Sequence, residues 1–390
     1  MRAANQAIAA RGRWAIAAIF LVNGFLIGSW APQIPVFLNR LDITEFTLGL
    51  LILLFGAGAV SAMAWAGHLI ARHGSKFVTS LFALTGSFGL LLVALAPNVP
   101  VAAITMFLFG GMIGAMDVSM NANAVTAEKM LGRAIMSSSH GFWSLGGFVG
   151  GGLGGIAIQS FGHLVHAVLV TAVAIVLVAV SLRHVVADAP TPQEHRRFIL
   201  PRSPAVYLLG LMALLCMNSE GAVLDWGALY MRQELGADIA TAGFAYAAFA
   251  GTMAAMRFLG DAVRNRFGAV ATFRISALVA AAGMLAAGIA PWSWLVIAAF
   301  AVSGLGIANM VPILFSAAGN QPGVSSGAGM SVVTTMGYSG ILAAPSLIGF
   351  VGERTGFSPV FVAIALLLVL VFMMSQLASA AEFSADTSQT

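Results

Sequence analysis

Residues 46–67, FTLGLLILLFGAGAVSAMAWAG, form an apolar block of 22 residues without a charged side chain. A helix of about 20 apolar residues is long enough to cross the hydrocarbon core of a bilayer. The rest of the chain has the same character, since only 8% of its 390 residues are charged and 59% are hydrophobic. We count twelve such blocks. They use nearly the whole chain and leave no room for a separate soluble domain.

The twelve blocks are predicted to be transmembrane helices. Their Ala, Leu and Gly content suits packed helices, and none has the ten-residue alternation of a membrane barrel strand. A cleaved signal peptide is not expected, because the first apolar stretch is too long and lacks a cleavage site. The predicted spans are residues 14–36, 46–67, 77–96, 101–124, 135–157, 164–184, 204–226, 239–258, 271–290, 295–316, 327–350 and 357–378.

The basic residues predict the orientation of these spans. Cytoplasmic loops are enriched in Lys and Arg. With the N-terminus in the cytoplasm, 15 of the 18 Lys and Arg residues fall on that side, and only Arg40, Arg232 and Arg354 fall outside. An even number of spans then places both termini in the cytoplasm. The formal charge of +4 is therefore a consequence of topology, and no nucleic acid partner is expected.

A proline-rich segment divides the chain near its middle. Residues 185–203 contain Pro190, Pro192 and Pro201 together with Arg196 and Arg197. We predict an N-terminal six-helix bundle over residues 1–184, a cytoplasmic linker over residues 185–203 and a C-terminal six-helix bundle over residues 204–390.

The two halves look duplicated. A shift of 196 residues places Trp30 on Trp226. The same shift places Ser160 on Gly356 and residue 161 on residue 357. Repeats of this kind are characteristic of secondary transporters, whose substrate site lies near the bilayer midplane.

A short motif follows the second span. Residues 67–76 read GHLIARHGSK, and this loop resembles the signature loop of the major facilitator superfamily at Gly67, Leu69, Arg72, Gly74 and Lys76. Ala71 stands where the family has Asp, and Ser75 stands at its first basic position. A looser copy after the eighth span consists of Arg257, Gly260, Asp261, Arg266 and Gly268. With twelve spans, the resemblance covers the whole chain and implies two pseudo-symmetric six-helix bundles.

In that family the paired loops help to close the cytoplasmic side. The resemblance therefore implies a cytoplasmic gate at Gly67, Arg72, Gly74, Lys76, Asp261 and Arg266. Ala71 cannot form the charge pair of the family's acid, so we expect Asp261 to be the main contributor. The alternative is that both loops only set the topology.

Within the superfamily, Asp117 and the stretch from residue 137 to residue 155 resemble the fucose-permease-like bacterial branch. An acid in the fourth span takes part in proton coupling there, and the resemblance implies this role for Asp117. The acid of that branch's first span has no match, because Asn23 stands in this region.

Ionisable side chains inside apolar spans cost about 2.5–3.5 kcal/mol or more, so they should face a cavity or a partner. Asp117 shares a helix face with Asn121, four residues later. It can act as a proton carrier or, alternatively, pair with a basic residue such as Arg133. In the seventh span, Glu220 and Asp225 point about 140° apart. We favour Glu220 for the cavity.

His140 begins a polar stripe in the fifth span, where Ser137 and Ser144 share its face. An unperturbed histidine titrates near neutral pH, so we add His140 to Asp117 and Glu220 as a candidate for proton coupling; a structural histidine is the alternative. For the substrate we expect polar and aromatic side chains on the facing helices. They are Asn23, Trp30, Asn121, Ser144, Asn218, Asn309 and Tyr338.

These residues suit a hydroxylated organic solute. We therefore expect a secondary active transporter that moves a small polar, sugar-like solute across the bacterial inner membrane by alternating access, coupled to protons. Multidrug or metabolite efflux is the alternative, favoured by 19 Met and 26 Phe. An intramembrane enzyme would need a nucleophile with its base, or paired metal ligands, within the spans. Such an enzyme is not expected, because His140 with Asp117 is the only candidate pair of catalytic residues. We expect a monomer in the lipid bilayer, without cofactor, metal or disulfide, since Cys216 is the single cysteine.

Overall fold

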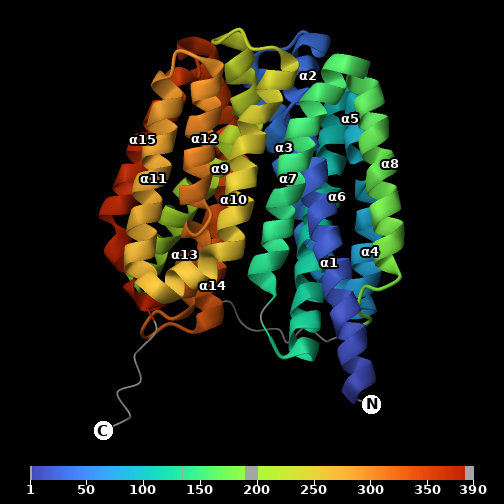
Figure 1. Ribbon diagram of the computed structural model, residues 1–390, viewed down its shortest axis with the longest axis vertical. Coiled ribbons are helices and arrows are strands. Elements are labelled where there is room, and N and C mark those ends of the chain that lie inside the picture. Colours follow the sequence, from blue (N-terminus) through green and yellow to red (C-terminus); the bar gives the residue numbers. More distant parts are fainter. Residues whose placement is uncertain (1, 134, 189–200, 383–390) are drawn as a thin grey trace.

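The computed structural model describes residues 2–133, 135–188 and 201–382, and in these ranges its regular structure is helical throughout (Figure 1). The first half contains α1 (Arg2–Trp30), α2 (Gln33–Leu41), α3 (Glu45–His73), α4 (Ser75–Gly86), α5 (Gly89–Leu95), α6 (Val99–Leu131), α7 (Met136–Phe161) and α8 (His163–Leu182). The second half contains α9 (Pro204–Gln233), α10 (Ile239–Phe267), α11 (Ala269–Ile289), α12 (Ser293–Ile307), α13 (Met310–Gly319), α14 (Ser326–Thr355), α15 (Ser358–Met373) and the short η1 (Ser375–Ala381).

Each predicted apolar block lies on a helix or on a pair of consecutive helices. Eleven spans in the described ranges are long and apolar enough to cross a membrane, and α15 with η1, bent by 55°, forms a twelfth candidate. The first span begins and ends earlier than predicted: it covers Ile8–Trp30, α1 ends at Trp30, and α2 follows after Pro32. The cause is local, because a proline disfavours the helical conformation of the residue before it.

The helices form two bundles. α1 to α8 pack mainly against one another, and so do α9 to η1; Figure 1 shows the first group in blue to green and the second in yellow to red. Two helix pairs make most of the contact between the groups, α7 with α10 and α3 with α14. A site at the interface of the two bundles, where these helices meet, can therefore receive side chains from both halves of the sequence.

The turns show the repeat at a different offset from the predicted one. α3 and α10 begin and end 194 residues apart, and Gly74 and Gly268 follow them with φ of 80° and 79°. Gly162 and Gly356 form a second such pair, with φ of 82° and 80°. The alignment of Ser160 with Gly356 is therefore wrong by two residues. Apolar helices match one another at many offsets, whereas a glycine with positive φ fixes the register.

The motif over residues 67–76 is not a loop, contrary to the sequence interpretation. α3 continues to His73 and α4 begins at Ser75, so Gly74 is the only non-helical residue. The second copy is likewise helical up to Phe267, and Gly268 makes the turn. The helix ends only where a glycine can adopt a positive φ without steric cost.

The beginning of the predicted linker packs on the first bundle. Asn123 Nδ2 donates a hydrogen bond of 2.8 Å to the Val186 carbonyl, and the Asp188 carboxylate accepts from the Ser75 and Lys76 amides at 2.9 and 3.2 Å. In the second half, the Glu382 carboxylate accepts from the first two amides of α11 at 3.0 and 2.9 Å. Residues 189–200 of the linker lie outside the described ranges.

The two bundles are joined firmly at one end. We call the end at which α1 begins the terminal end, and the opposite one the far end; in Figure 1 the terminal end is at the bottom. At the far end, Gln233 Nε2 donates to Glu45 Oε1 at 2.7 Å, and the Phe46 amide donates to Glu353 at 3.1 Å. Ser346 Oγ donates to the Gly49 carbonyl at 3.2 Å. The described hydrogen bonds between α3 and α14 lie at this end.

Candidate functional site

Arg257 is the centre of the polar cluster between the bundles. It lies on α10, ten residues before the helix ends, which corresponds to about 15 Å along the helix axis. Its Nη2 is 3.6 Å from Glu220 Oε2 of α9, and the two side chains are 15% and 18% exposed. Glu220 itself lies near the middle of α9. The sequence interpretation took Arg257 for a charge at the membrane boundary, but the structure places it inside the bundle as the partner of Glu220.

Arg257 also reaches the other half of the molecule. Its Nη1 donates to Ser144 Oγ of α7 at 2.5 Å, and its backbone carbonyl accepts from Ser137 Oγ at 3.0 Å. The guanidinium carbon lies 5.8 Å from the centroid of the Trp143 ring, within the range of a cation–π contact. The side chain of Arg257 therefore ties the Glu220 carboxylate of the second half to Ser144 and Trp143 of α7 in the first, and its backbone carbonyl adds a bond to Ser137.

Trp143 connects this cluster to α1. Its Nε1 donates to Asn23 Oδ1 at 2.9 Å, and Asn23 Nδ2 donates to the Ile113 carbonyl at 3.4 Å. Asn23 is 2% exposed. Both polar atoms of this predicted substrate ligand are thus used within the first half, where they hold the indole ring under Arg257.

Asp117 lies with Asn121 on α6. Asn121 Nδ2 donates to Asp117 Oδ1 at 3.3 Å and to the Asp117 carbonyl at 2.9 Å. Tyr338 of α14 is close enough to both Asp117 and Glu220 to be affected by their charges. The alternative partner Arg133 is excluded, because it is exposed beyond the end of α6, about 24 Å along the helix from Asp117.

His140 is adjacent to the cluster on α7. Its ring packs edge-on against Phe20 with 5.1 Å between centroids, and it lies within electrostatic reach of Arg257. Its carbonyl accepts from Ser144 Oγ at 3.3 Å. The structure therefore brings together Asp117, Asn121, His140, Ser144, Glu220 and Tyr338 among the predicted site residues.

Three other predicted substrate ligands lie apart from this cluster. Trp30 is 4% exposed and packs edge-on against Phe37, with 5.3 Å between centroids. Asn309 is 8% exposed, and its Oδ1 lies directly against Gly260 of α10. Asn218 lines a separate small cavity between α9 and α14. Trp30 is at the end of α1, and Asn309 and Asn218 contact other parts of the second half.

The predicted gate residues build the turns of the terminal end. Gly67 lies inside α3, Arg72 is exposed, Gly74 makes the turn, and the Lys76 amide is bonded to Asp188. Arg266 is exposed, with its guanidinium 5.8 Å from the Phe267 ring, and the side chain of Asp261 lies outside the described part of the structure. The described hydrogen bonds of residues 67–76 stay within the first bundle, so they hold its turn rather than join the halves.

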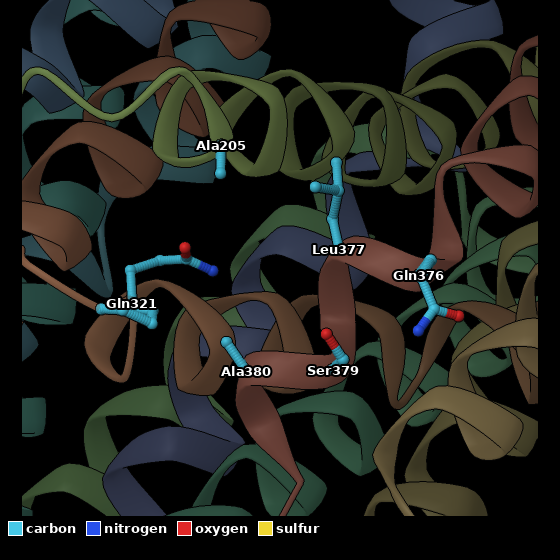
Figure 2. Close-up of a pocket in the computed structure, with 7 residues that line it drawn as sticks. Ala205, Gln321, Gln376, Leu377, Ser379 and Ala380 are labelled. Atoms are coloured by element: carbon cyan, nitrogen blue, oxygen red, sulfur yellow. The ribbon is translucent and has the colours of Figure 1, made fainter.

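An open hollow of about 320 Å³ lies at the terminal end of the second bundle (Figure 2). It is lined by the start of α9, the connection between α13 and α14, and η1, and none of its lining residues is charged. It receives no side chain from the first half. We therefore place the candidate site at the Arg257 cluster between the bundles.

Two helical bundles that meet around a polar cluster are the architecture of a membrane transporter. The chain belongs to the Major Facilitator Superfamily, whose family model matches residues 16–226 and 208–380. An uncharacterized MFS-type transporter of Yersinia pestis is 33% identical over 353 residues, which cover 90% of this chain and 92% of that protein.

Solved structures agree on the fold. The nucleoside transporter NupG has a TM-score of 0.72 at 14% identity, over 94% of this chain and 98% of that one. A D-xylose-proton symporter has a TM-score of 0.70 at 14% identity, over 92% and 96%. The chain is therefore a secondary transporter with the fold of this superfamily.

Proposed function

We propose that this transporter is a proton symporter that carries a small polar organic solute across the bacterial inner membrane. The observation that carries the proposal is the position of Arg257, which pairs with Glu220 in its own half and bonds Ser144 in the other. A charge in the membrane interior is costly and usually marks a substrate or ion pathway. A solute or proton that competes for these contacts changes the link between the halves, as alternating access requires.

Asp117 and Glu220 are the proposed proton carriers. Both lie near Tyr338. Glu220 has an ion-pair partner, whereas Asp117 has, among the residues that the structure describes, only the amide of Asn121. Protonation of Glu220 removes the charge that holds Arg257, so proton uptake weakens the cluster. His140, packed against Phe20, is the third candidate and sits beside Arg257.

A polar solute is favoured by the chemistry of the cluster. It offers the donors of Arg257, the carboxylate of Asp117, the amide of Asn121, the phenol of Tyr338 and the face of Trp143. Hydroxylated rings use such donors and acceptors on their edges and an aromatic platform on their apolar face. Sugars, polyols and nucleosides fit this description; solved structures with the same fold include a nucleoside transporter and a xylose-proton symporter.

The terminal end is proposed to face the cytoplasm. In the predicted topology 15 of the 18 basic residues fall on that side, and 14 remain once Arg257 is assigned to the cluster between the bundles. In this orientation the cytoplasmic termini and the turns at Gly74 and Gly268 share one side. The bonds between Glu45, Gln233, Phe46 and Glu353 then close the periplasmic side.

Transport into proteoliposomes tests this function. Purified protein is reconstituted with a pH gradient, acidic outside, and uptake of labelled pentoses, hexoses, polyols and nucleosides is measured. We expect accumulation of a member of this panel that collapses with a protonophore. Absence of uptake for the whole panel, with drug resistance on overexpression, would instead support efflux.

Asp117→Asn tests the coupling separately. A neutral side chain of the same shape cannot release a proton, so we expect solute counterflow to persist while gradient-driven accumulation is lost. Asp42→Asn, at an exposed residue in a left-handed turn with φ of 50°, is the matched control. Unchanged accumulation in Asp117→Asn would remove Asp117 from the mechanism.

A further inference from the structure

A small cavity lies between α9 and α14 on a different face of α9 from Glu220. Asn218, Asp225 and Trp226 supply its polar lining, and Ala344, Pro345 and Ile348 of α14 close it. It holds about 20 Å³ of space that the centre of a water molecule can occupy, which is enough for one water. The seven-residue spacing of Asn218 and Asp225 puts both side chains on this face.

The polar atoms of this cavity lack protein partners. Asp225 is 9% exposed and Trp226 is 1% exposed. Within the described ranges, Trp226 Nε1 and Asn218 Oδ1 are fully buried without a hydrogen bond, and Asp225 has no hydrogen-bond or ion-pair partner. Buried polar groups in native proteins are nearly always paired with protein or water. The cavity therefore requires a ligand that both donates and accepts hydrogen bonds.

The lining suits a proton and a water rather than a metal cation. A cation needs several oxygen ligands, but one of the three polar groups here is an indole N–H, which is only a donor. When Asp225 is ionised, the N–H of Trp226 donates a hydrogen bond to the water, and the water donates one to the Asp225 carboxylate. A protonated Asp225 can donate its own hydrogen to the water, which in turn can donate to Asn218 Oδ1. Each protonation state of Asp225 thus has a complementary partner in the same cavity.

The titratable surroundings of Asp225 are few. Tyr246 of α10 is fully buried with an unpaired hydroxyl in the described structure, and Asp225, Glu220 and Arg257 all act on it electrostatically. α12, α13 and α15, which also pack on α9, contain no titratable residue. The titratable residues of α14, which are Tyr338, Glu353 and Arg354, do not line the cavity, and Arg40 of α2 bonds the carbonyls of Val93 and Ala96.

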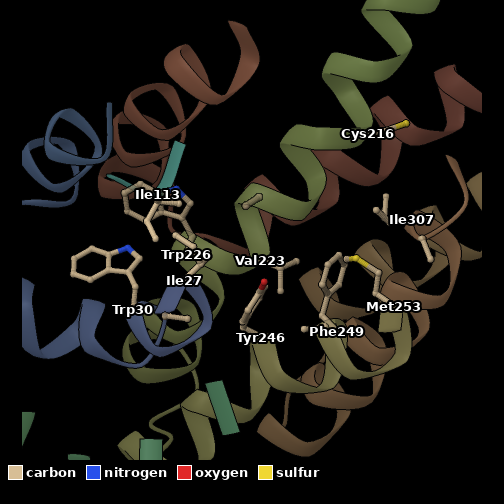
Figure 3. Packing of buried hydrophobic residues seen from close by; sticks show 14 of the residues in the cluster. Ile27, Trp30, Ile113, Cys216, Val223, Trp226, Tyr246, Phe249, Met253 and Ile307 are labelled. Carbon is tan, nitrogen blue, oxygen red and sulfur yellow. The ribbon is translucent and has the colours of Figure 1, made fainter. Parts of the chain in front are cut away.

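This cavity is connected to both helix pairs that join the halves. A Cβ on Gly349 of α14 would lie 2.9 Å from Trp226 Cη2 and would collide with the Glu45 carbonyl of α3. A Cβ on Gly147 of α7 would lie 3.1 Å from the Tyr246 hydroxyl. Figure 3 shows Trp226 and Tyr246 in the same packed region as Ile27 and Trp30 of α1. A change in hydrogen bonding at Asp225 therefore acts on side chains that touch the opposite half.

We propose that Asp225, with water held by Asn218 and Trp226, is a second proton site that controls the far-end closure. Ionised Asp225 holds the Trp226 indole through the water, and the ring supports the contact of Gly349 with Glu45. Protonation removes the negative charge that attracts the indole N–H through the water, and so loosens this contact. The inference rests on the proposed proton coupling for its role in the cycle, but the site itself is tested without a solute.

The first test is the indole N–H signal of Trp226 in ¹⁵N-tryptophan-labelled protein in detergent, assigned with Trp226→Phe. We expect the signal to titrate with pH in the unmodified chain and in Asp117→Asn and Glu220→Gln, and to be fixed in Asp225→Asn. A signal that does not titrate, or that becomes fixed in Glu220→Gln, overturns the proposal. A shift when sodium replaces potassium at constant pH overturns it in favour of a cation site.

A second variant covers the case in which Asp225→Asn does not fold. Asn218→Ala removes the acceptor of the protonated state, so the midpoint of the Trp226 titration should move to lower pH. An unchanged midpoint contradicts the assigned role of Asn218 and with it the proposed site.

The control of the closure is measured by thiol labelling. Ser346→Cys in a Cys216→Ala background places a single thiol at the α3–α14 contact. Its labelling rate should rise several-fold in Asp225→Asn, which mimics the protonated acid, and should not change in Asp42→Asn. Equal labelling rates in Asp225→Asn and the unmodified chain would overturn the proposal that Asp225 controls the far-end closure. Failure of solute accumulation in proteoliposomes, in contrast, contradicts only the proposed transport function.

Discussion

Arg257 illustrates how one side chain acquires its role from its neighbours. The guanidinium is paired with Glu220 at 3.6 Å and bonded to Ser144 at 2.5 Å, so its charge is satisfied by groups from both halves. A lysine cannot make both contacts in the same way, because only the guanidinium has several donors fixed in one plane. The exchange of either partner should therefore change both stability and the link between the bundles.

A double-mutant cycle tests the pair. Arg257→Gln and Glu220→Gln should each lower the stability by about 1–3 kcal/mol, since each leaves a largely buried charge without its partner. The double variant should lose less than the sum of the two. Thermal unfolding in detergent measures this, with the exposed Arg11→Gln as control. Strict additivity would show that the two charges do not interact.

Trp143 and Asn23 give a second prediction at this scale. Trp143→Phe removes the donor to Asn23 Oδ1 and leaves a buried acceptor unpaired, at a cost of about 1–3 kcal/mol. Trp294→Phe, at a residue 62% exposed, should stay within about 0.5 kcal/mol of the unmodified protein. Unfolding midpoints in detergent compare the two, and equal midpoints would contradict a structural role for the Trp143 hydrogen bond.

At the scale of the helices, the turns at the terminal end decide where one helix ends and the next begins. Gly74 separates α3 from α4 by a single residue, and Gly268 separates α10 from α11 in the same way. The carboxylates of Asp188 and Glu382, which follow the last helix of each half, accept hydrogen bonds from the first amides of α4 and α11. Anionic groups at helix N-termini satisfy free amides and interact favourably with the helix dipole. Each bundle is thus fastened by its own C-terminal segment.

Gly74→Ala tests the turn. Its φ of 80° and ψ of 160° are nearly exclusive to glycine, and a Cβ would lie 2.7 Å from the Asp188 carbonyl. We expect a loss of about 1–3 kcal/mol. Gly132→Asn is the matched control, because Gly132 is left-handed with φ of 65° and nothing lies within 4 Å of an added Cβ. Equal unfolding midpoints for both variants would contradict the strain at Gly74.

At the scale of the molecule, the far-end closure defines the conformation. Gln233 and Glu45 bring α9 and α3 together, and Glu353 of α14 bonds the Phe46 amide. Alternating access requires these contacts to break in each cycle. A covalent link across them should therefore stop transport without unfolding the protein.

Glu45→Cys with Gln233→Cys, in a Cys216→Ala background, provides this link. Glu45 Oε1 and Gln233 Nε2 are 2.7 Å apart, but cysteine is shorter than either native side chain, so a bifunctional thiol-reactive cross-linker with a reducible disulfide joins the two thiols. We expect loss of solute uptake after cross-linking, with recovery after reduction. Each single cysteine variant is the control. Uptake that continues in the cross-linked protein would show that the far end does not open during the cycle.

The long apolar blocks allowed the helices and the family to be predicted from the sequence. Most of the candidate site was predicted from one rule: an ionisable side chain inside an apolar span is costly and therefore faces a cavity or a partner. This rule identified Asp117, Glu220 and His140. Arg257 was missed, although it lies inside the predicted block 239–258, because a positive charge near a span end is explained equally well by topology. Asn23 was predicted to bind the substrate, but in the structure its amide bonds Trp143 and the Ile113 carbonyl.

The sequence by itself determined that the chain is a helical membrane transporter, because span length, hydropathy and positive charge are local properties of the chain. Gly74 and Gly268 stand where a positive φ is needed, but the sequence did not show that the helices on both sides run up to these glycines. Only the tertiary structure decided that Glu220 pairs with Arg257, that Asp225 faces a separate cavity with Trp226, and that the repeat runs at 194 residues. Which side chains on different helices become partners depends on the rotation and register of those helices. The close packing of the whole bundles sets both.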